Sequence, residues 1–229
     1  MPRQPNQINS DIYPGDNVDV VFDACQPWPL EDNSIGHVRS HHVLEHLCEP
    51  KMFFKEAYRV LAPSDDECNV TLRLPYGASN DAIGDITHLR QWVPTSFACF
   101  QPGYGASVYN KQHNSWDAPF AVITIYQRIN PQLRWLLKPI IRNFGVKIIE
   151  FLWGGYQEMI IGMKALKKPD EVARWQVRNR SATVPVARVM YHHEYEGREI
   201  GENEKPRFLF FGPGGRELQK QADKGSVYE

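Results

Sequence analysis

The chain has 229 residues, a formal net charge of −1 and a pI of about 6.7, with 42% hydrophobic and 23% charged residues. This composition is typical of one sizeable globular domain and excludes wholesale disorder or a fibrous repeat. Near-neutral charge gives no general attraction to nucleic acid or to an anionic membrane surface. The sequence also has no apolar run long enough to span a bilayer and no apolar block of a secretory signal at its start. We therefore expect a cytoplasmic protein that binds neither nucleic acid nor membranes.

The four cysteines do not form any C-x-x-C pair; they are Cys25, Cys48, Cys68 and Cys99. This spacing disfavours both a disulfide framework and a thiolate zinc site. Reduced thiols are the expected state.

Strand and helix patterns alternate in the first third of the chain. The predicted elements are, in order, an irregular lead-in over 1–17, a strand over 18–22, a loop bracketed by prolines over 26–33, a strand over 37–40, a helix over 49–61 that Pro63 ends, and a strand over 69–74. Such alternation is typical of an α/β fold whose sheet is mostly parallel and joined by crossover helices.

Later elements are fewer. The predictions are a β-rich run over 120–126, a helix over 133–141 in which Pro139 makes a kink or an end, and a strand over 158–166. The apolar stripe of the 133–141 helix favours a core-facing helix over attachment to a membrane surface. After residue 167 a basic stretch gives way to an acidic one, so we predict a domain over 1–167 and an appendage over 168–229.

His42-Val43-Leu44-Glu45-His46 matches the H-x-x-E-H pattern of some zinc peptidases. On a helix, His42 and His46 would share a face and could hold zinc, with Glu45 as a base. The sequence offers no convincing third ligand, and His42 falls where a strand is ending. We therefore interpret the segment as a strand-to-helix loop and expect no metal.

Two further patterns could carry chemistry. Asp23 and Ala24 follow a strand, and ligands of open parallel sheets bind beyond the carboxyl ends of the strands, although an Asp there is also common in turns. Asp85 and His88 are either an acid–base pair or parts of an Asx turn.

Together these patterns resemble the class I S-adenosylmethionine-dependent methyltransferases, and most closely their small-molecule branch. The segments that carry the resemblance are 10–14, 18–23, 27–34, 41–47, 56–63, 72–75, 85–92 and 95–97. They keep one order and spacing over roughly residues 10–166, which is far more specific than any single motif. The implied fold is a Rossmann-like methyltransferase sheet with a C-terminal appendage.

The resemblance also implies roles for individual residues. The cofactor side comprises Asp11 at the ribose hydroxyls, Asp23 and Ala24 at the adenine, and His42 near the methyl-bearing sulfur. The catalytic side comprises His41, His88 and Asp85. His41 or His88 would take the proton of an acceptor hydroxyl or amine.

The family begins with a strand and a Gly-rich loop, whereas the first glycine here is Gly15. The resemblance therefore implies an N-terminally truncated sheet without its first strand, which normally lies between the second and fourth strands. Three arrangements could close the gap: a contracted sheet, a strand donated by a partner chain, or residues 207–211 of the appendage.

Two functions remain open. The first is methyl transfer from S-adenosylmethionine to a small-molecule or saccharide acceptor. The second is a catalytically inactive methyltransferase-like scaffold that uses Trp116, Trp135, Trp153 and the appendage for protein binding or for assembly into a homo-oligomer.

Overall fold

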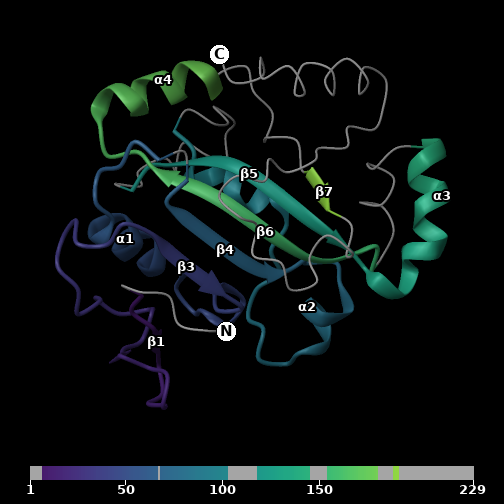
Figure 1. Cartoon of the computed structure of the whole chain (residues 1–229), viewed down its shortest axis with the longest axis horizontal. Helices are drawn as coiled ribbons and strands as arrows, with labels where there is room; N and C mark the ends of the chain where they lie inside the picture. Colours follow the sequence, from purple (N-terminus) through teal and green to yellow (C-terminus); the bar gives the residue numbers. More distant parts are fainter. Residues whose placement is uncertain (1–6, 67, 103–117, 145–153, 180–187, 191–229) are drawn as a thin grey trace.

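The structure, a computed structural model, describes residues 7–66, 68–102, 118–144, 154–179 and 188–190 (Figure 1). The strands are β1 (Ser10–Asp11), β2 (Val20–Val21), β3 (Val38–His41), β4 (Val70–Pro75), β5 (Phe120–Ile129), β6 (Tyr156–Ala165) and β7 (Arg188–Met190). The α-helices are α1 (Pro50–Val60), α2 (Asn80–Gly84), α3 (Arg134–Phe144) and α4 (Pro169–Asn179). Three short 3₁₀ helices are η1 (Leu44–His46), η2 (Pro94–Phe100) and η3 (Pro131–Leu133). The predicted α/β class is confirmed.

The larger sheet has five strands in the order β3-β4-β6-β5-β7. β3 runs parallel to β4, whereas β6 is antiparallel to both of its neighbours, β4 and β5. The strands β3, β4, β5 and β7 all run in one direction, so the expectation of a mostly parallel sheet is confirmed, with β6 as the exception. β4 and β5 run in the same direction, as crossover connections require, but they are not neighbours. β6 lies between them and runs in the opposite direction.

Helix α1 confirms the helix predicted over residues 49–61. The Glu49 carboxylate accepts a hydrogen bond from Lys51 N at 3.3 Å, and Pro50 occupies the first turn, where a missing N–H costs nothing. Its apolar face is fully buried, and the Phe54 ring packs on Phe100 and Phe120 with centroid distances of 3.9 and 5.8 Å. The core of the domain thus lies between α1 and the larger sheet.

A second, two-stranded sheet is formed by β1 and β2, which pair in parallel and lie apart from the larger sheet in Figure 1. The fully irregular lead-in predicted for residues 1–17 is wrong at Ser10 and Asp11, because their backbone pairs with Val20 and Val21. The predicted strand over 18–22 shortens to two residues. The contracted sheet is also not formed, since β3 pairs with β4 and not with β1 or β2. Residues 207–211 lie outside the described part, and a donated strand remains a prediction.

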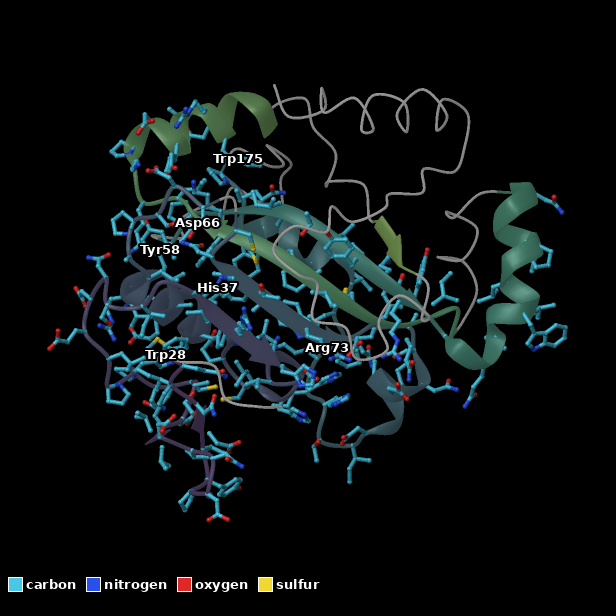
Figure 2. The ribbon with its side chains drawn as sticks, in the orientation of Figure 1. Trp28, His37, Tyr58, Asp66, Arg73 and Trp175 are labelled. Atoms are coloured by element: carbon cyan, nitrogen blue, oxygen red, sulfur yellow. The ribbon has the colours of Figure 1, made fainter. Side chains whose placement is uncertain are left out.

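Arg59 fastens the proline-bracketed loop that follows β2 onto α1. Its Nη1 donates to Asp32 Oδ1 at 2.6 Å and to Leu30 O at 2.8 Å, and its Nη2 donates to Trp28 O at 2.9 Å and to Glu56 Oε2 at 2.7 Å. Glu56 Oε2 also accepts a hydrogen bond from Trp28 N at 2.8 Å. The indole of Trp28, which is labelled in Figure 2, packs edge-on against Phe53. The small sheet is therefore attached through this loop and α1.

The free thiols of Cys25 and Cys48 lie on the same junction, with their sulfur atoms 3.3 Å apart. Burial is the main reason why the pKa of the Cys25 thiol is raised. None of the four cysteines is in a disulfide here, and the reduced state expected in solution remains a prediction.

Helix α3 contains Pro139 in its interior and does not end there. Leu137 is buried, and Leu133 and Ile140 pack partly against the core, as the core-facing alternative predicted. Trp135 points away from the core and is 76% exposed. Of the helices in the described ranges, none has the length and apolar character needed to cross a membrane.

Beyond residue 167 the described chain forms α4 and the short strand β7. β7 pairs in parallel with β5, over Arg188–Met190 against Tyr126–Arg128. The predicted appendage thus adds an edge strand to the larger sheet. The domain boundary itself remains a prediction.

Replacing Arg59 with Lys is expected to lower the free energy of unfolding by about 2 kcal/mol, because an ammonium group cannot reproduce the forked contacts with two carbonyls and two carboxylates. Urea denaturation followed by circular dichroism measures the loss. Arg174→Lys is the matched control: its exposed i,i+4 pair with Asp170 should change stability by less than about 0.5 kcal/mol. Equal losses in the two variants would contradict the role assigned to Arg59.

Candidate active site at the end of strand β3

The chain leaves β3 through a constrained turn. His42 has φ 51°, in the left-handed region that non-glycine residues rarely adopt. Its N–H donates to Arg73 O at 2.8 Å, and its ring contacts two carboxylates, so the surrounding structure holds the conformation. Unusual backbone of this kind is common at functional sites.

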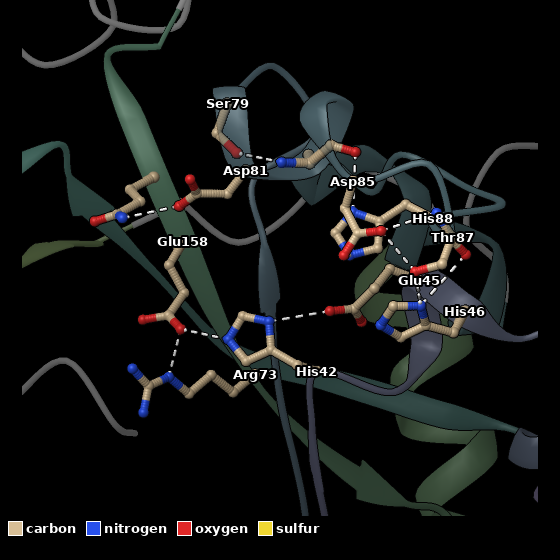
Figure 3. A network of polar contacts seen from close by, with 12 residues as sticks. His42, Glu45, His46, Arg73, Ser79, Asp81, Asp85, Thr87, His88 and Glu158 are labelled. Atoms are coloured by element: carbon tan, nitrogen blue, oxygen red, sulfur yellow. Dashed lines mark hydrogen bonds and ion pairs between the residues drawn. The ribbon is translucent and has the colours of Figure 1, made fainter.

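Glu158 on β6 is the centre of the polar network that Figure 3 shows. Its Oε1 contacts His42 Nε2 at 2.9 Å and accepts from Arg73 Nε at 2.5 Å, and its Oε2 pairs with Arg128 Nη1 at 3.4 Å. The side chain is only 7% exposed. Burial alone would raise the pKa of this carboxyl, but the hydrogen bonds from His42 and Arg73 outweigh burial and lower it to about 2.

The two histidines at the end of β3 differ in charge. Hydrogen bonds to Glu158 and then to Glu45 raise the pKa of His42 to about 9, so it is an imidazolium at neutral pH. Burial, followed by the charges of Arg73 and His42, lowers the pKa of His41. The rings of His41 and His42 meet edge-on, with centroids 4.7 Å apart. His41 is exposed and neutral, which leaves it able to accept a proton.

Asp85 and His88 lie on a loop that is fastened to η1. Leu89 N donates to Glu45 O at 2.8 Å, and Arg90 N donates to the same oxygen at 3.3 Å. Trp92 lies further along this loop, and its carbonyl oxygen accepts a hydrogen bond from Gly77 N at 2.7 Å. A Cβ on residue 77 would lie 2.8 Å from that oxygen, so only glycine fits there.

Asp85 forms an Asx turn, and not an acid–base pair with His88. Asp85 Oδ1 accepts from Thr87 N at 2.8 Å and from Thr87 Oγ1 at 2.6 Å, and these bonds lower the pKa of Asp85. Asp85 Oδ2 is 3.7 Å from His88 Nε2, longer than a hydrogen bond. The His88 side chain is 8% exposed, which makes it less accessible than His41 to an acceptor.

Three of the predicted cofactor residues, Asp11, Asp23 and Ala24, lie at the small sheet, whereas His42 directly follows β3 of the larger sheet. Asp11 ends β1 and is exposed, and its Oδ1 accepts from Tyr13 N at 3.0 Å. Asp23 follows β2 and is half-buried, and its Oδ1 accepts from Cys25 N at 2.8 Å. Ala24 O accepts from Trp28 Nε1 at 3.4 Å. Among the described residues, no hydrogen bond or ion pair joins these three to His41, so their place in one site remains a prediction.

Sequence reasoning missed Glu158, Arg73 and Arg128. A signal was present, since each is a charged residue inside a strand that is otherwise largely apolar, and such a charge is kept in a sheet only with a partner. Which charges pair could not be read, because the sequence does not show that β6 lies beside β4.

Residues 5–64 match the family model described as a methyltransferase domain. This match covers 60 of the 229 residues and confirms the resemblance read from the motifs of this segment. A comparison with curated proteins gives no significant match.

Several solved structures are similar at low identity. The [4+2]-cyclase SpnF has 16% identity and a TM-score of 0.37, with 65% of this chain and 57% of that chain covered. A SAM-dependent methyltransferase from Archaeoglobus fulgidus has 16% identity and a TM-score of 0.40, with 69% and 75% covered. Phosphoethanolamine N-methyltransferase 2 of Haemonchus contortus has 13% identity and a TM-score of 0.33, with 64% and 36% covered. Similarity this low carries no argument about activity, and the chain spans only 57% of the cyclase and 36% of the Haemonchus contortus enzyme.

The free energy of unfolding is expected to fall as the pH rises from 6.5 through 9. A His whose pKa is raised on folding stabilises the protein fully below its ordinary pKa of 6.5, and this contribution is lost once the folded form deprotonates near 9. Because the His42 side chain is 39% exposed, we expect a loss of about 1 kcal/mol after solvent screening. Urea titrations at pH 6.5 and 9.5 measure it.

The matched variants are His42→Asn, which tolerates the left-handed backbone, and His37→Asn. The first should remove most of this pH dependence. The second should retain it, because burial lowers the pKa of His37 and places its titration below pH 6.5. If His42→Asn lost as much free energy of unfolding between pH 6.5 and 9.5 as the unmodified protein, the raised pKa assigned to His42 would be contradicted.

Proposed function

We propose that the chain binds S-adenosylmethionine and transfers its methyl group to a small-molecule or saccharide acceptor. The observation that carries the proposal is the match of residues 5–64 to the methyltransferase-domain model. Further support comes from the positions of Asp11 and His41, which each end a strand with a parallel neighbour, and of Asp23, which lies two residues after such a strand. The carboxyl ends of parallel strands are where open α/β sheets bind ligands.

The residues on the cofactor side have suitable chemistry. Carboxylates are acceptors, and Asp11 and Asp23 can accept hydrogen bonds from ribose hydroxyls and an exocyclic amine. S-Adenosylmethionine supplies an electrophilic methyl group on a cationic sulfur. Ala24, next to Asp23, offers a small apolar surface to the adenine ring of the cofactor.

Among the predicted catalytic residues, His41 is the better candidate base. Its ring is exposed and neutral, whereas both ring nitrogens of His42 already contact carboxylates and the His88 side chain is nearly buried. His41 would take the proton of the acceptor hydroxyl or amine as the oxygen or nitrogen bonds to the methyl carbon and the methyl–sulfur bond breaks, with S-adenosylhomocysteine as the leaving group. Most of the acceleration would come from holding the reactants in line, with the base adding to it.

Isothermal titration calorimetry with S-adenosylmethionine or S-adenosylhomocysteine tests the proposal. Asp23→Asn is expected to weaken binding about tenfold, which corresponds to about 1.4 kcal/mol for a lost charge-assisted hydrogen bond. Asp16→Asn is the control, since it removes the same charge from an exposed turn between the two aspartates. Absence of heat at millimolar cofactor, with the protein folded by circular dichroism, would reject the proposal.

The inactive scaffold is the second candidate, and the exposed aromatic surface of α3 favours it. Trp135 is 76% and Leu136 45% exposed, and side chains of this kind often mark a contact with another protein. The scaffold function predicts an oligomer or stable complex by light scattering, together with no cofactor binding. A monomer that methylates an acceptor would exclude it.

A further inference from the structure

Glu45, His46 and His88 form a cluster beside His41, and it shares His88 with the residues predicted to be catalytic. Each offers one ligand atom, and these three atoms lie within 4.8 Å of one another. The rings of His46 and His88 meet with their centroids 4.7 Å apart. The two elements that carry the cluster are η1 and the 85–88 loop, which the backbone bonds of Glu45 O to Leu89 and Arg90 hold together.

Both imidazoles are oriented by contacts through Nδ1. His88 Nδ1 lies 3.0 Å from Ala82 O, and a carbonyl can only accept, so this nitrogen carries the proton. His46 Nδ1 lies 3.3 Å from Thr87 O and 3.1 Å from Thr87 Oγ1, whose own proton is directed to Asp85. In both rings the lone pair is therefore on Nε2. An imidazole that donates Nδ1–H to a backbone carbonyl and presents Nε2 is typical of a metal-ligating histidine.

The Glu45 carboxylate supplies the second, independent observation. Its side chain is fully buried, and its Oε1 contacts His42 Nδ1 at 3.0 Å. Its Oε2 is buried without a hydrogen-bond partner among the described residues. Figure 3 shows the carboxylate between His42 on one side and His46 on the other. A buried carboxylate oxygen without a partner is costly, and a cation at this position would satisfy it.

We propose that Glu45, His46 and His88 bind a divalent transition-metal ion, with Zn²⁺ as the best match. Two imidazole nitrogens and one carboxylate oxygen are a known zinc ligand set that leaves one position open. Ligands of a tetrahedral Zn²⁺ lie about 3.3 Å apart, so atoms within 4.8 Å need only small side-chain rotations to close around the ion.

The bound ion would cross-link η1 to the 85–88 loop, next to the end of β3. The sequence pattern pointed to His42 and His46 as the ligand pair, and it lacked a third ligand. The structure assigns the histidine role to His88 in place of His42, because Glu45 and Glu158 already occupy both ring nitrogens of His42. The same contacts argue against a site made by His41, His42 and Glu158, the other group with suitable spacing among the described residues.

The test uses the untagged full chain without S-adenosylmethionine, so its result is independent of the proposed methyl transfer. Zn²⁺ is titrated by calorimetry, and Co²⁺ is added separately to record the visible absorption of a cobalt–imidazole complex. We expect one ion per chain. His46→Gln should weaken Zn²⁺ binding at least tenfold and remove the Co²⁺ absorption. His37→Gln, which changes an exposed histidine outside the cluster, should leave both unchanged.

His88→Gln should act like His46→Gln, but its side chain is nearly buried and the variant could fail to fold. His46 is exposed, so His46→Gln keeps the test valid in that case. The proposal is overturned by absence of binding at millimolar Zn²⁺, or by wild-type affinity in folded His46→Gln. Loss of the site in His41→Gln with its retention in His46→Gln would also overturn it.

Discussion

The buried carboxylate of Glu158 is the constraint on which the candidate site depends. It stands on β6 and contacts Arg73 on β4, Arg128 on β5 and His42 at the turn after β3, so one side chain ties together four segments. A carboxylate so buried is tolerated because three cationic groups surround it. The contact with Glu158 keeps His42 charged, whereas burial is the main reason why the pKa of His41 is lowered. The charge of His42 therefore depends on a strand more than a hundred residues away.

The two sheets are joined by a different kind of interaction. No strand pairing links the β1–β2 sheet to the larger sheet among the described residues; the guanidinium of Arg59 fastens the intervening loop to α1 instead. Asp11 and Asp23 are carried by the small sheet, and His41 by the large one. Any ligand that contacts both groups must bridge the junction, so the rigidity of the Arg59 network bears on how well the two halves are positioned.

Local patterns in the sequence predicted the elements that local forces determine. The apolar spacing of α1 gave a helix correct to within one residue at each end, and the segments of β4, β5 and β6 were recognised from their β-rich composition. The direction and place of β6 were not predictable, because antiparallel insertion between β4 and β5 depends on pairing between distant segments. For the same reason the partners of Glu158 and the approach of His88 to His46 could not be read. The family resemblance placed Asp11 at a strand end, which the pattern alone had not done, whereas the strands before Asp23 and His41 were predicted from the pattern.

The central place of β6 has a consequence for biosynthesis. Val70 pairs with Met163 and Pro75 with Glu158, so the inner edge of β4 stays without its neighbour until the ribosome has released residues near 165. Contacts between segments so distant in the chain slow folding, because a long loop must close before they form. The nascent chain therefore passes through a stage in which a largely apolar strand is open to other chains, and chaperones that shield such edges would raise the yield of folded protein.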